Sequence, residues 1–229
     1  MYIIAEIGIN HNGSLETALQ MIQAAYEAGA DCVKFQKRNP DKCVPENQKS
    51  KIRIFQGKEM TYLDYKKAIE FEEKEYDIIN KYCKNLGIAW TASVWDIDSV
   101  LFMKKYLNDI PFIKIPSACI TDFDLLNAVN DLDIPVIISD GMSTFEEINK
   151  AINHLFNLQG ILHCNSSYPS QNNELDLNVI KTYNTMYSDY IIGYSGHEMG
   201  YFPTLIAIAV GAKIVERHFT LDNNMEGTD

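Results

Sequence analysis

The chain has 229 residues, 46% of them hydrophobic, and a formal net charge of −11. These values predict a globular domain with a substantial core, and they disfavour nucleic acid as a partner, because phosphates bind clustered Lys and Arg. We expect no membrane span and no signal peptide, and the five scattered cysteines, with no C-x-x-C pair, favour a reducing cytoplasm over a disulfide scaffold or a zinc site.

Short apolar runs alternate along the chain with helical patterns. After the first run comes a helix candidate with one apolar face, for which Ser14 is the expected N-cap and Gly29 the expected stop. In chain order the runs cover residues 2–8, 32–38, 88–94, 112–118, 135–141, 160–166, 190–196 and 212–219. Strands that alternate with helices pair in parallel, and eight of them predict a (β/α)8 TIM barrel. A doubly wound sheet is the alternative, but no G-x-G-x-x-G follows the first run.

Nearly every run begins with apolar residues and ends with polar ones. In a TIM barrel the carboxyl ends of the strands converge on one face, where active sites lie. We therefore expect a polar site there, although polar residues can also simply mark strand ends. The polar residues concerned are Glu6, Lys34, Gln36, Thr91, Ser93, Lys114, Ser117, Ser139, Asp140, Asn165, Ser166, Ser195, His197 and His218.

The longest interruption of this alternation is residues 38–70. It is too long for an ordinary connection, and such excursions are often functional. We expect it to fold over the mouth of the barrel, with a purely structural excursion as the alternative.

Two histidines occupy matching positions at the ends of the last two predicted strands. Neighbouring strands lie about 4.8 Å apart, so His197 and His218 can reach one metal ion at about 2.1 Å each. Two protein ligands leave positions open for substrate and water, and mixed nitrogen and oxygen ligation favours Mn²⁺, with Co²⁺ or Mg²⁺ as alternatives. A lone strand histidine, by contrast, is more often simply hydrogen-bonded.

Six stretches form a recognisable set: AEIGINHNGSLETALQMIQAAYEAGADCVKFQ, IKIPSA, SDGMST, LHCNSSYP, IGYSGHEMG and VERHFTLDNNMEGTD. In combination they resemble the sialic acid synthase (N-acetylneuraminate synthase) family over residues 2–229. The resemblance implies condensation of phosphoenolpyruvate with an N-acetylated aldose such as N-acetylmannosamine, giving a nine-carbon 2-keto sugar acid and phosphate. It also implies a homodimer in the full-length form, whose small antifreeze-like C-terminal domain caps the partner's site. Against that pattern, we expect residues 1–229 to form a single TIM-barrel domain that stops after strand eight, without the last helix or the antifreeze-like domain.

The resemblance also implies residue roles. Lys34, Thr91, Lys114, Ser117, Ser166 and Ser195 match positions that hold phosphoenolpyruvate. The metal ligands match His197 and His218, and the positions that face the amino sugar match Gln36, Tyr168 and Asp229. Glu6 matches the acid near the metal and the reacting carbons, where it would move a proton or stabilise a developing cation, while Lys34 and Lys114 hold the phosphate. Because two buried lysines are costly without an anion, we expect an anionic ligand, with an ion pair to an acid such as Glu6 as the alternative.

Two positions depart from the family pattern. Cys119 stands where an acid is frequent, and Asp140 replaces the threonine of S-T-G-M and is expected at the mouth. Both departures are compatible with a different sugar or with reduced activity.

Three other functions stay open. The chain can be a synthase for legionaminic or pseudaminic acid, a Schiff-base aldolase that uses Lys114, or an inactive fragment of such a synthase that binds ligand. We also expect the outer face of the last strand to be apolar and exposed, which would promote self-association.

Overall fold

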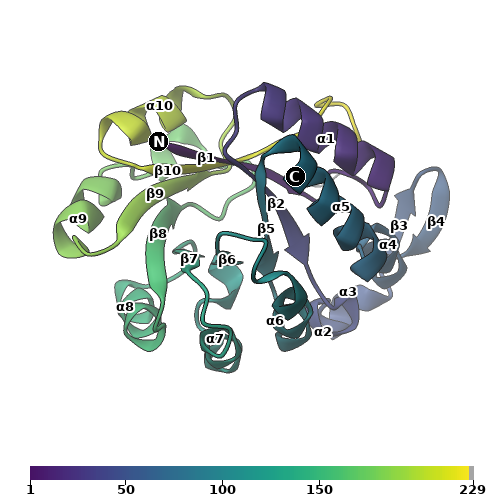
Figure 1. The fold of residues 1–229 in the computed structure, drawn as a ribbon, viewed down its shortest axis with the longest axis horizontal. Helices are drawn as coiled ribbons and strands as arrows, with labels where there is room; N and C mark the ends of the chain where they lie inside the picture. The colour runs from purple at the N-terminus through teal and green to yellow at the C-terminus, as the bar shows by residue number, and fades with distance from the viewer. Residues whose placement is uncertain (227–229) are drawn as a thin grey trace.

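A computed structural model describes residues 1–226 and has the predicted closed barrel. Eight parallel strands close in the order β1-β10-β9-β8-β7-β6-β5-β2 (Figure 1). Each of them falls on one of the predicted apolar runs. Their bounds are β1 Tyr2–Gly8, β2 Cys32–Lys37, β5 Ala89–Val94, β6 Ile113–Ile115, β7 Val136–Ser139, β8 Leu158–Cys164, β9 Ile191–Gly196 and β10 Ile214–His218.

Helices surround the barrel. The predicted first helix is confirmed, with Ser14 accepting a hydrogen bond from the Thr17 amide at its N-terminus and Gly29 in a left-handed conformation just beyond its end. The longer helices are α1 Leu15–Glu27, α5 Glu73–Leu86, α6 Ile97–Met103, α7 Phe123–Asn130, α8 Phe145–His154, α9 Val179–Met186 and α10 Phe202–Ala209. Short 3-10 turns cover Lys104–Tyr106, Ser117–Cys119 and Asn172–Glu174. Within residues 1–226, no helix has the length and apolar character needed to cross a bilayer.

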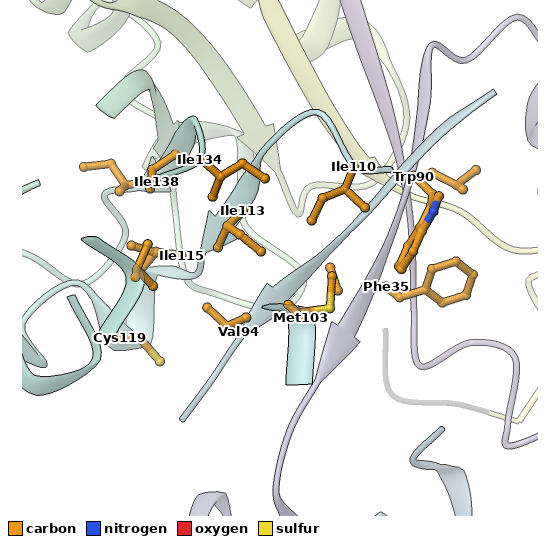
Figure 2. Close-up of a cluster of buried hydrophobic side chains, with 14 of the residues drawn as sticks. Phe35, Trp90, Val94, Met103, Ile110, Ile113, Ile115, Cys119, Ile134 and Ile138 are labelled. Carbon is orange, nitrogen blue, oxygen red and sulfur yellow. The ribbon is translucent and has the colours of Figure 1, made fainter. Parts of the chain in front are cut away.

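The side chains of each strand alternate between two apolar regions. Outward side chains such as Phe35, Trp90 and Ile113 pack against the helices in one large cluster (Figure 2). The inward positions nearest the amino ends of the strands form a smaller cluster that fills the barrel floor: Ile4, Cys32, Phe112, Ile137, Leu162 and Ile214. Two residues further along, the inward positions become polar. This layering explains why the runs begin apolar and end polar.

The excursion after β2 forms a unit of its own. It contains α2 Pro40–Cys43, α3 Glu46–Lys49, the antiparallel hairpin β3 Ile52–Phe55 and β4 Lys58–Thr61, and α4 Tyr62–Ile69. Phe55, Tyr65 and Ile69 pack with Ile9, which follows β1. Figure 1 shows the hairpin at the edge of the molecule beside α4. The expectation that this segment covers the barrel mouth is wrong, because within residues 1–226 the central cavity has no lining residue from 37–92.

Candidate active site

A cavity of about 140 Å³ opens at the carboxyl ends of the barrel strands. Of the predicted site residues that the structure describes, all except Thr91 line it. Those present are Glu6, Lys34, Gln36, Lys114, Ser117, Ser166, Tyr168, Ser195, His197 and His218. The sequence therefore predicted most of the residues that line this cavity. The barrel brings together side chains up to 212 positions apart in the chain.

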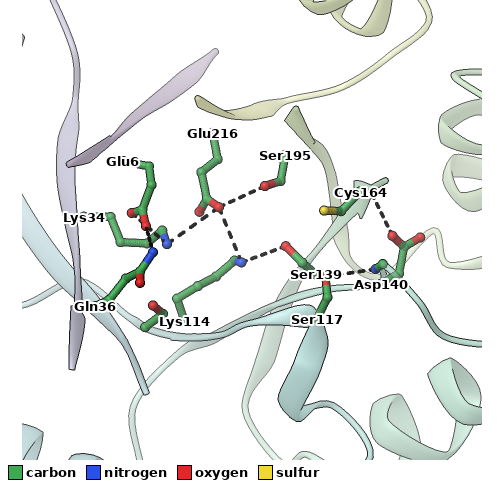
Figure 3. Close-up of polar contacts among 12 residues, drawn as sticks. Glu6, Lys34, Gln36, Lys114, Ser117, Ser139, Asp140, Cys164, Ser195 and Glu216 are labelled. Atoms are coloured by element: carbon green, nitrogen blue, oxygen red, sulfur yellow. Dashed lines mark hydrogen bonds and ion pairs between the residues drawn. The ribbon is translucent and has the colours of Figure 1, made fainter. Parts of the chain in front are cut away.

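Two lysines and two glutamates form a buried charge cluster at the bottom of this cavity (Figure 3). The Lys34 ammonium lies 2.8 Å from Glu6 and 3.7 Å from Glu216. Lys114 lies 3.6 Å from Glu216 and donates to the Ser139 hydroxyl at 2.7 Å. The cluster balances two positive charges with two negative ones. The premise that the lysines lack an anion until a ligand binds is therefore wrong, and the ion-pair alternative holds for this structure.

The burial of this cluster perturbs its ionisation. Burial lowers the pKa of Lys114, and Glu216 only partly opposes the effect. Burial alone would raise the pKa of Glu216, but Lys114 and Lys34 outweigh it and hold that pKa at about 2. Glu216 is therefore ionised at neutral pH and shared by both lysines.

Sequence reasoning missed Glu216 as a site residue. The signal was available, because strand side chains alternate with a period of two. Any pattern that turns His218 toward the cavity also turns Glu216 inward, two residues earlier. Ser139 and Trp95 also line the cavity without having been assigned a role.

The two predicted metal ligands lie side by side, with ring centroids 5.4 Å apart. His197 Nδ1 donates to the Asn165 carbonyl at 2.6 Å, which fixes the tautomer and leaves the Nε2 lone pair facing the cavity. Nε2 accepts the Tyr168 hydroxyl at 2.7 Å. Burial lowers the pKa of His197 to about 4, although the Asn165 bond opposes this, so the imidazole is neutral and can act as a ligand at pH 7.

The spacing of these rings fits a shared metal ion. Two imidazoles bound to one metal at about 2.1 Å place their centroids roughly 4.5–5.5 Å apart for N–metal–N angles of roughly 90–110°. Within residues 1–226, no cluster of three or more His, Cys, Asp or Glu side chains is arranged to hold a metal. A metal ion held between these rings would have His197 and His218 as its imidazole ligands, and Tyr168 would have to release His197 Nε2.

Three of the predicted serines also line the cavity. Ser117 accepts a hydrogen bond from the Gly141 amide at 3.0 Å, and Ser195 donates to Glu216 at 2.9 Å. Gly141 packs closely against two of these serines: a β-carbon there would lie 2.2 Å from the Ser166 hydroxyl and 2.9 Å from that of Ser117. The glycine is thus required for the two hydroxyls to approach one another.

The residues predicted to face the sugar lie at the rim. The side-chain amide nitrogen of Gln36 donates to Glu6 at 2.8 Å. The side-chain carbonyl of Gln36 accepts a hydrogen bond from Arg38, which stacks on Trp95. Tyr168 stacks on His197 with ring centroids 4.0 Å apart. Asp229, the third predicted residue, lies outside the described residues.

Thr91 does not reach the cavity. It is fully buried, and its hydroxyl donates to the Phe112 carbonyl. It pairs in register with Lys34, whose long side chain spans the distance to the cavity that the threonine hydroxyl cannot. Ser93, two residues later on the same face, lines the cavity instead.

The two departures from the family pattern both lie away from the cavity. The expectation that Asp140 stands at the mouth is wrong: its carboxylate is buried, accepts from the Cys164 amide at 2.7 Å and lies beside Cys164 in Figure 3. Cys119 is buried too, and its thiol faces the Trp95 carbonyl. Burial raises the pKa of that thiol to about 12, which fits an inert residue.

Comparison with known proteins gives a consistent result. The NeuB family model matches residues 21–229. The chain is 38% identical over its whole length to the N-acetylneuraminate-9-phosphate synthase of Drosophila melanogaster and 32% identical to the N,N'-diacetyllegionaminic acid synthase of Legionella pneumophila. It spans 62% and 66% of the length of these two curated relatives.

A solved structure agrees with these relatives. The N-acetylneuraminic acid synthetase of Leptospira borgpetersenii, determined in complex with citrate, superposes with a TM-score of 0.89 at 32% identity. The match covers 99% of this chain and 75% of that one.

Proposed function

The chain belongs to the NeuB family, and on this premise we propose that it condenses phosphoenolpyruvate with an N-acetylated aldose. The products would be a 2-keto sugar acid of the sialic acid type and phosphate. One observation carries the proposal: a buried pair of lysines lines the same cavity as two imidazoles whose ring centroids are 5.4 Å apart.

Phosphoenolpyruvate fits the lysine side of the cavity by charge and size. Lys34 and Lys114 supply two ammonium groups, and Ser117, Ser166 and Ser195 supply hydroxyls for phosphate and carboxylate oxygens. Glu216 now holds both lysines, so the substrate must compete with a resident carboxylate. The cavity of about 140 Å³ is of a size for one such small anion.

The amino sugar requires a second space. A hollow of about 390 Å³ lies on the other side of Tyr168, His197 and His218, and these three side chains form its common wall with the first cavity. A sugar in this hollow can direct its aldehyde carbon across the imidazoles toward the methylene carbon of phosphoenolpyruvate. Tyr168, Gln36 and Asp229 remain our candidates for sugar contacts.

His197 and His218 would hold a divalent metal, for which we propose Mn²⁺ over Mg²⁺ or Co²⁺. When bound, such an ion supplies Lewis acidity for the aldehyde oxygen. The neutral state of His197 and the bond from its Nδ1 to Asn165 support this role.

The proposed reaction forms one carbon–carbon bond and breaks the carbon–oxygen bond to phosphate. The methylene carbon of phosphoenolpyruvate forms a C–C bond to the aldehyde carbon, water adds to the carbon that carries phosphate, and that carbon–oxygen bond breaks to release phosphate. Glu6 lies at the lysine–glutamine junction, where its carboxylate can stabilise positive charge or take a proton from water. Lys34 and Lys114 hold the departing phosphate.

Phosphate release from phosphoenolpyruvate tests the proposal directly. A panel of N-acetylated sugars, including N-acetylmannosamine and a 2,4-diacetamido hexose, should reveal one substrate that requires Mn²⁺. His218→Ala should abolish metal-dependent turnover, and ¹⁸O in the bridging ester oxygen should leave with phosphate. No release with any sugar, while phosphoenolpyruvate still binds, would support the inactive ligand-binding alternative.

One observation favours a second candidate, the Schiff-base aldolase. Burial lowers the pKa of Lys114, as such a nucleophile requires. Borohydride reduction with a carbonyl substrate should then attach that substrate to Lys114. An unlabelled lysine would remove this alternative.

A further inference from the structure

A loop of residues 165–175, here called the strap, follows β8 and supplies several parts of the site. Ser166 and Tyr168 line the cavity, and the Asn165 carbonyl orients His197. Its two ends are joined at the base: Asn165 Nδ2 donates to the Glu174 carbonyl at 2.9 Å, and His163 Nε2 lies 2.8 Å from the Leu175 carbonyl. The position of Tyr168 therefore depends on how firmly this base is held.

His163 must donate from both ring nitrogens. Nε2 faces the Leu175 carbonyl, which can only accept a hydrogen bond. Nδ1 lies 3.1 Å from Asp140 Oδ2, which also accepts the Tyr183 hydroxyl at 2.7 Å, while Oδ1 accepts the Cys164 amide. The Cys164 amide and the Tyr183 hydroxyl both donate to this side chain, so Nδ1, like Nε2, faces an acceptor, and the geometry calls for hydrogen on both ring nitrogens.

The surroundings of His163 favour this charged form. Asp140 comes from the end of β7 and Asp176 from the end of the strap, while the tyrosines Tyr183 of α9 and Tyr194 of β9 pack nearby. Burial of the ring lowers the pKa of His163, but the hydrogen bond and charge of Asp140, together with the Leu175 carbonyl and the charge of Asp176, outweigh that effect, and the net result is a raised pKa. When the ring loses one proton, the remaining hydrogen stays on Nδ1, because the Asp140 carboxylate is a stronger acceptor than the Leu175 carbonyl, so the Leu175 bond is the one that is lost. Because the pKa is raised, the anchoring is complete below the ordinary value of about 6.5 and is lost as pH rises through the folded-state value.

We propose that Asp140 and protonated His163 are positioning residues that anchor the strap, and with it Ser166, Tyr168 and the orientation of His197. Neither residue lines the cavity among the residues that the structure describes. The catalytic consequence rests on the proposed function, whereas the anchoring itself does not.

Two uncharged variants separate the two bonds of His163. In His163→Gln the amide nitrogen can take the place of Nε2 and keep the bond to Leu175, whereas in His163→Asn it takes the place of Nδ1 and keeps only the bond to Asp140. Hydrogen exchange of the strap amides Ser167, Ser170, Gln171 and Glu174, all hydrogen-bonded here, measures the anchoring.

We expect strap exchange to be roughly ten- to hundredfold faster in His163→Asn than in His163→Gln, with α1 amides unchanged in both. Strap protection in the wild type, corrected for intrinsic rates, should fall as pH rises from about 6 to 9, and Asp140→Asn should remove that fall. In the sugar assay, His163→Asn should raise KM more than it lowers kcat. Equal strap exchange in the two His163 variants, or wild-type protection that does not change with pH, would overturn the proposal. If the wild type shows no turnover with any sugar while strap exchange behaves as expected, the result would count against the proposed function alone.

Discussion

Glu216→Gln is the most informative substitution in the charge cluster. The amide preserves the volume of the side chain and can still accept the Ser195 hydroxyl, but it removes the negative charge shared by Lys34 and Lys114. Two buried ammonium groups would then have only Glu6 as a counter-charge. We expect a less stable protein that binds anions more tightly, since an entering phosphate no longer has to displace a carboxylate.

The magnitude follows from the burial of this ion pair. Folding lowers the Glu216 pKa because Lys114 and Lys34 stabilise the carboxylate, and removing one partner of a buried ion pair costs about 3 kcal/mol or more. Because the folded-state pKa is depressed, that contribution is present above pH 4.5 and is lost as pH falls toward about 2. For a chain of this size, about 3 kcal/mol lowers Tm by roughly 6–12 °C.

Thermal denaturation at pH 7, with and without inorganic phosphate, measures both effects. Glu59→Gln makes the same chemical change at an exposed position on β4 and should leave Tm within about 1–2 °C of the wild type. Phosphate should stabilise Glu216→Gln more than it stabilises the wild type. A variant as stable as the wild type, or one with weaker phosphate binding, would refute the idea that Glu216 is the anion that phosphoenolpyruvate replaces.

Three further predictions concern other parts of the molecule. Gly141→Ala should raise KM for phosphoenolpyruvate about tenfold or more, because its β-carbon would lie 2.2 Å from the Ser166 hydroxyl; an unchanged KM would show that this serine does not contact the substrate. Thr91→Val should cost about 1 kcal/mol in urea unfolding through the lost bond to Phe112, with KM for phosphoenolpyruvate within about twofold of the wild type; a larger rise would restore the substrate contact implied by the family resemblance. The expectation that the outer face of the last strand is exposed is wrong, because Val215 on that face is only 4% exposed. Self-association should instead use α10, appear in light scattering and be reduced by Phe202→Lys combined with Leu205→Lys, since these side chains are 68% and 52% exposed; a monodisperse wild-type monomer would contradict it.

The same α10 surface bears on the homodimer implied by the family resemblance. Phe202, Leu205 and Ile206 give an apolar face on the outside of the barrel. The homodimer stays a proposal, and the light-scattering measurement tests it together with self-association.

The barrel and the polar carboxyl ends of its strands could be predicted from the residues alone. Eight apolar runs that each end in polar residues place Glu6, Lys34 and His218 on one face of a parallel barrel. The sequence also predicted the N-cap at Ser14 and the pairing of the last two strands, which brings their histidines together. Both features depend on contacts between neighbouring elements.

The depth of each side chain in the barrel and its charge and hydrogen-bond partners could not be predicted without the three-dimensional packing. Period two gives the face of a strand but not the height of a side chain in the barrel, so Thr91 and Ser93 looked equivalent although only Ser93 reaches the cavity. Loops have no periodicity, so nothing in the sequence indicated that Asp140 turns to His163, or that Tyr168 lies on a histidine 29 residues later. The balance of two lysines by Glu6 and Glu216 likewise emerged only when strands from opposite ends of the chain closed the barrel, because charge pairing depends on distance in space and not on position in the sequence.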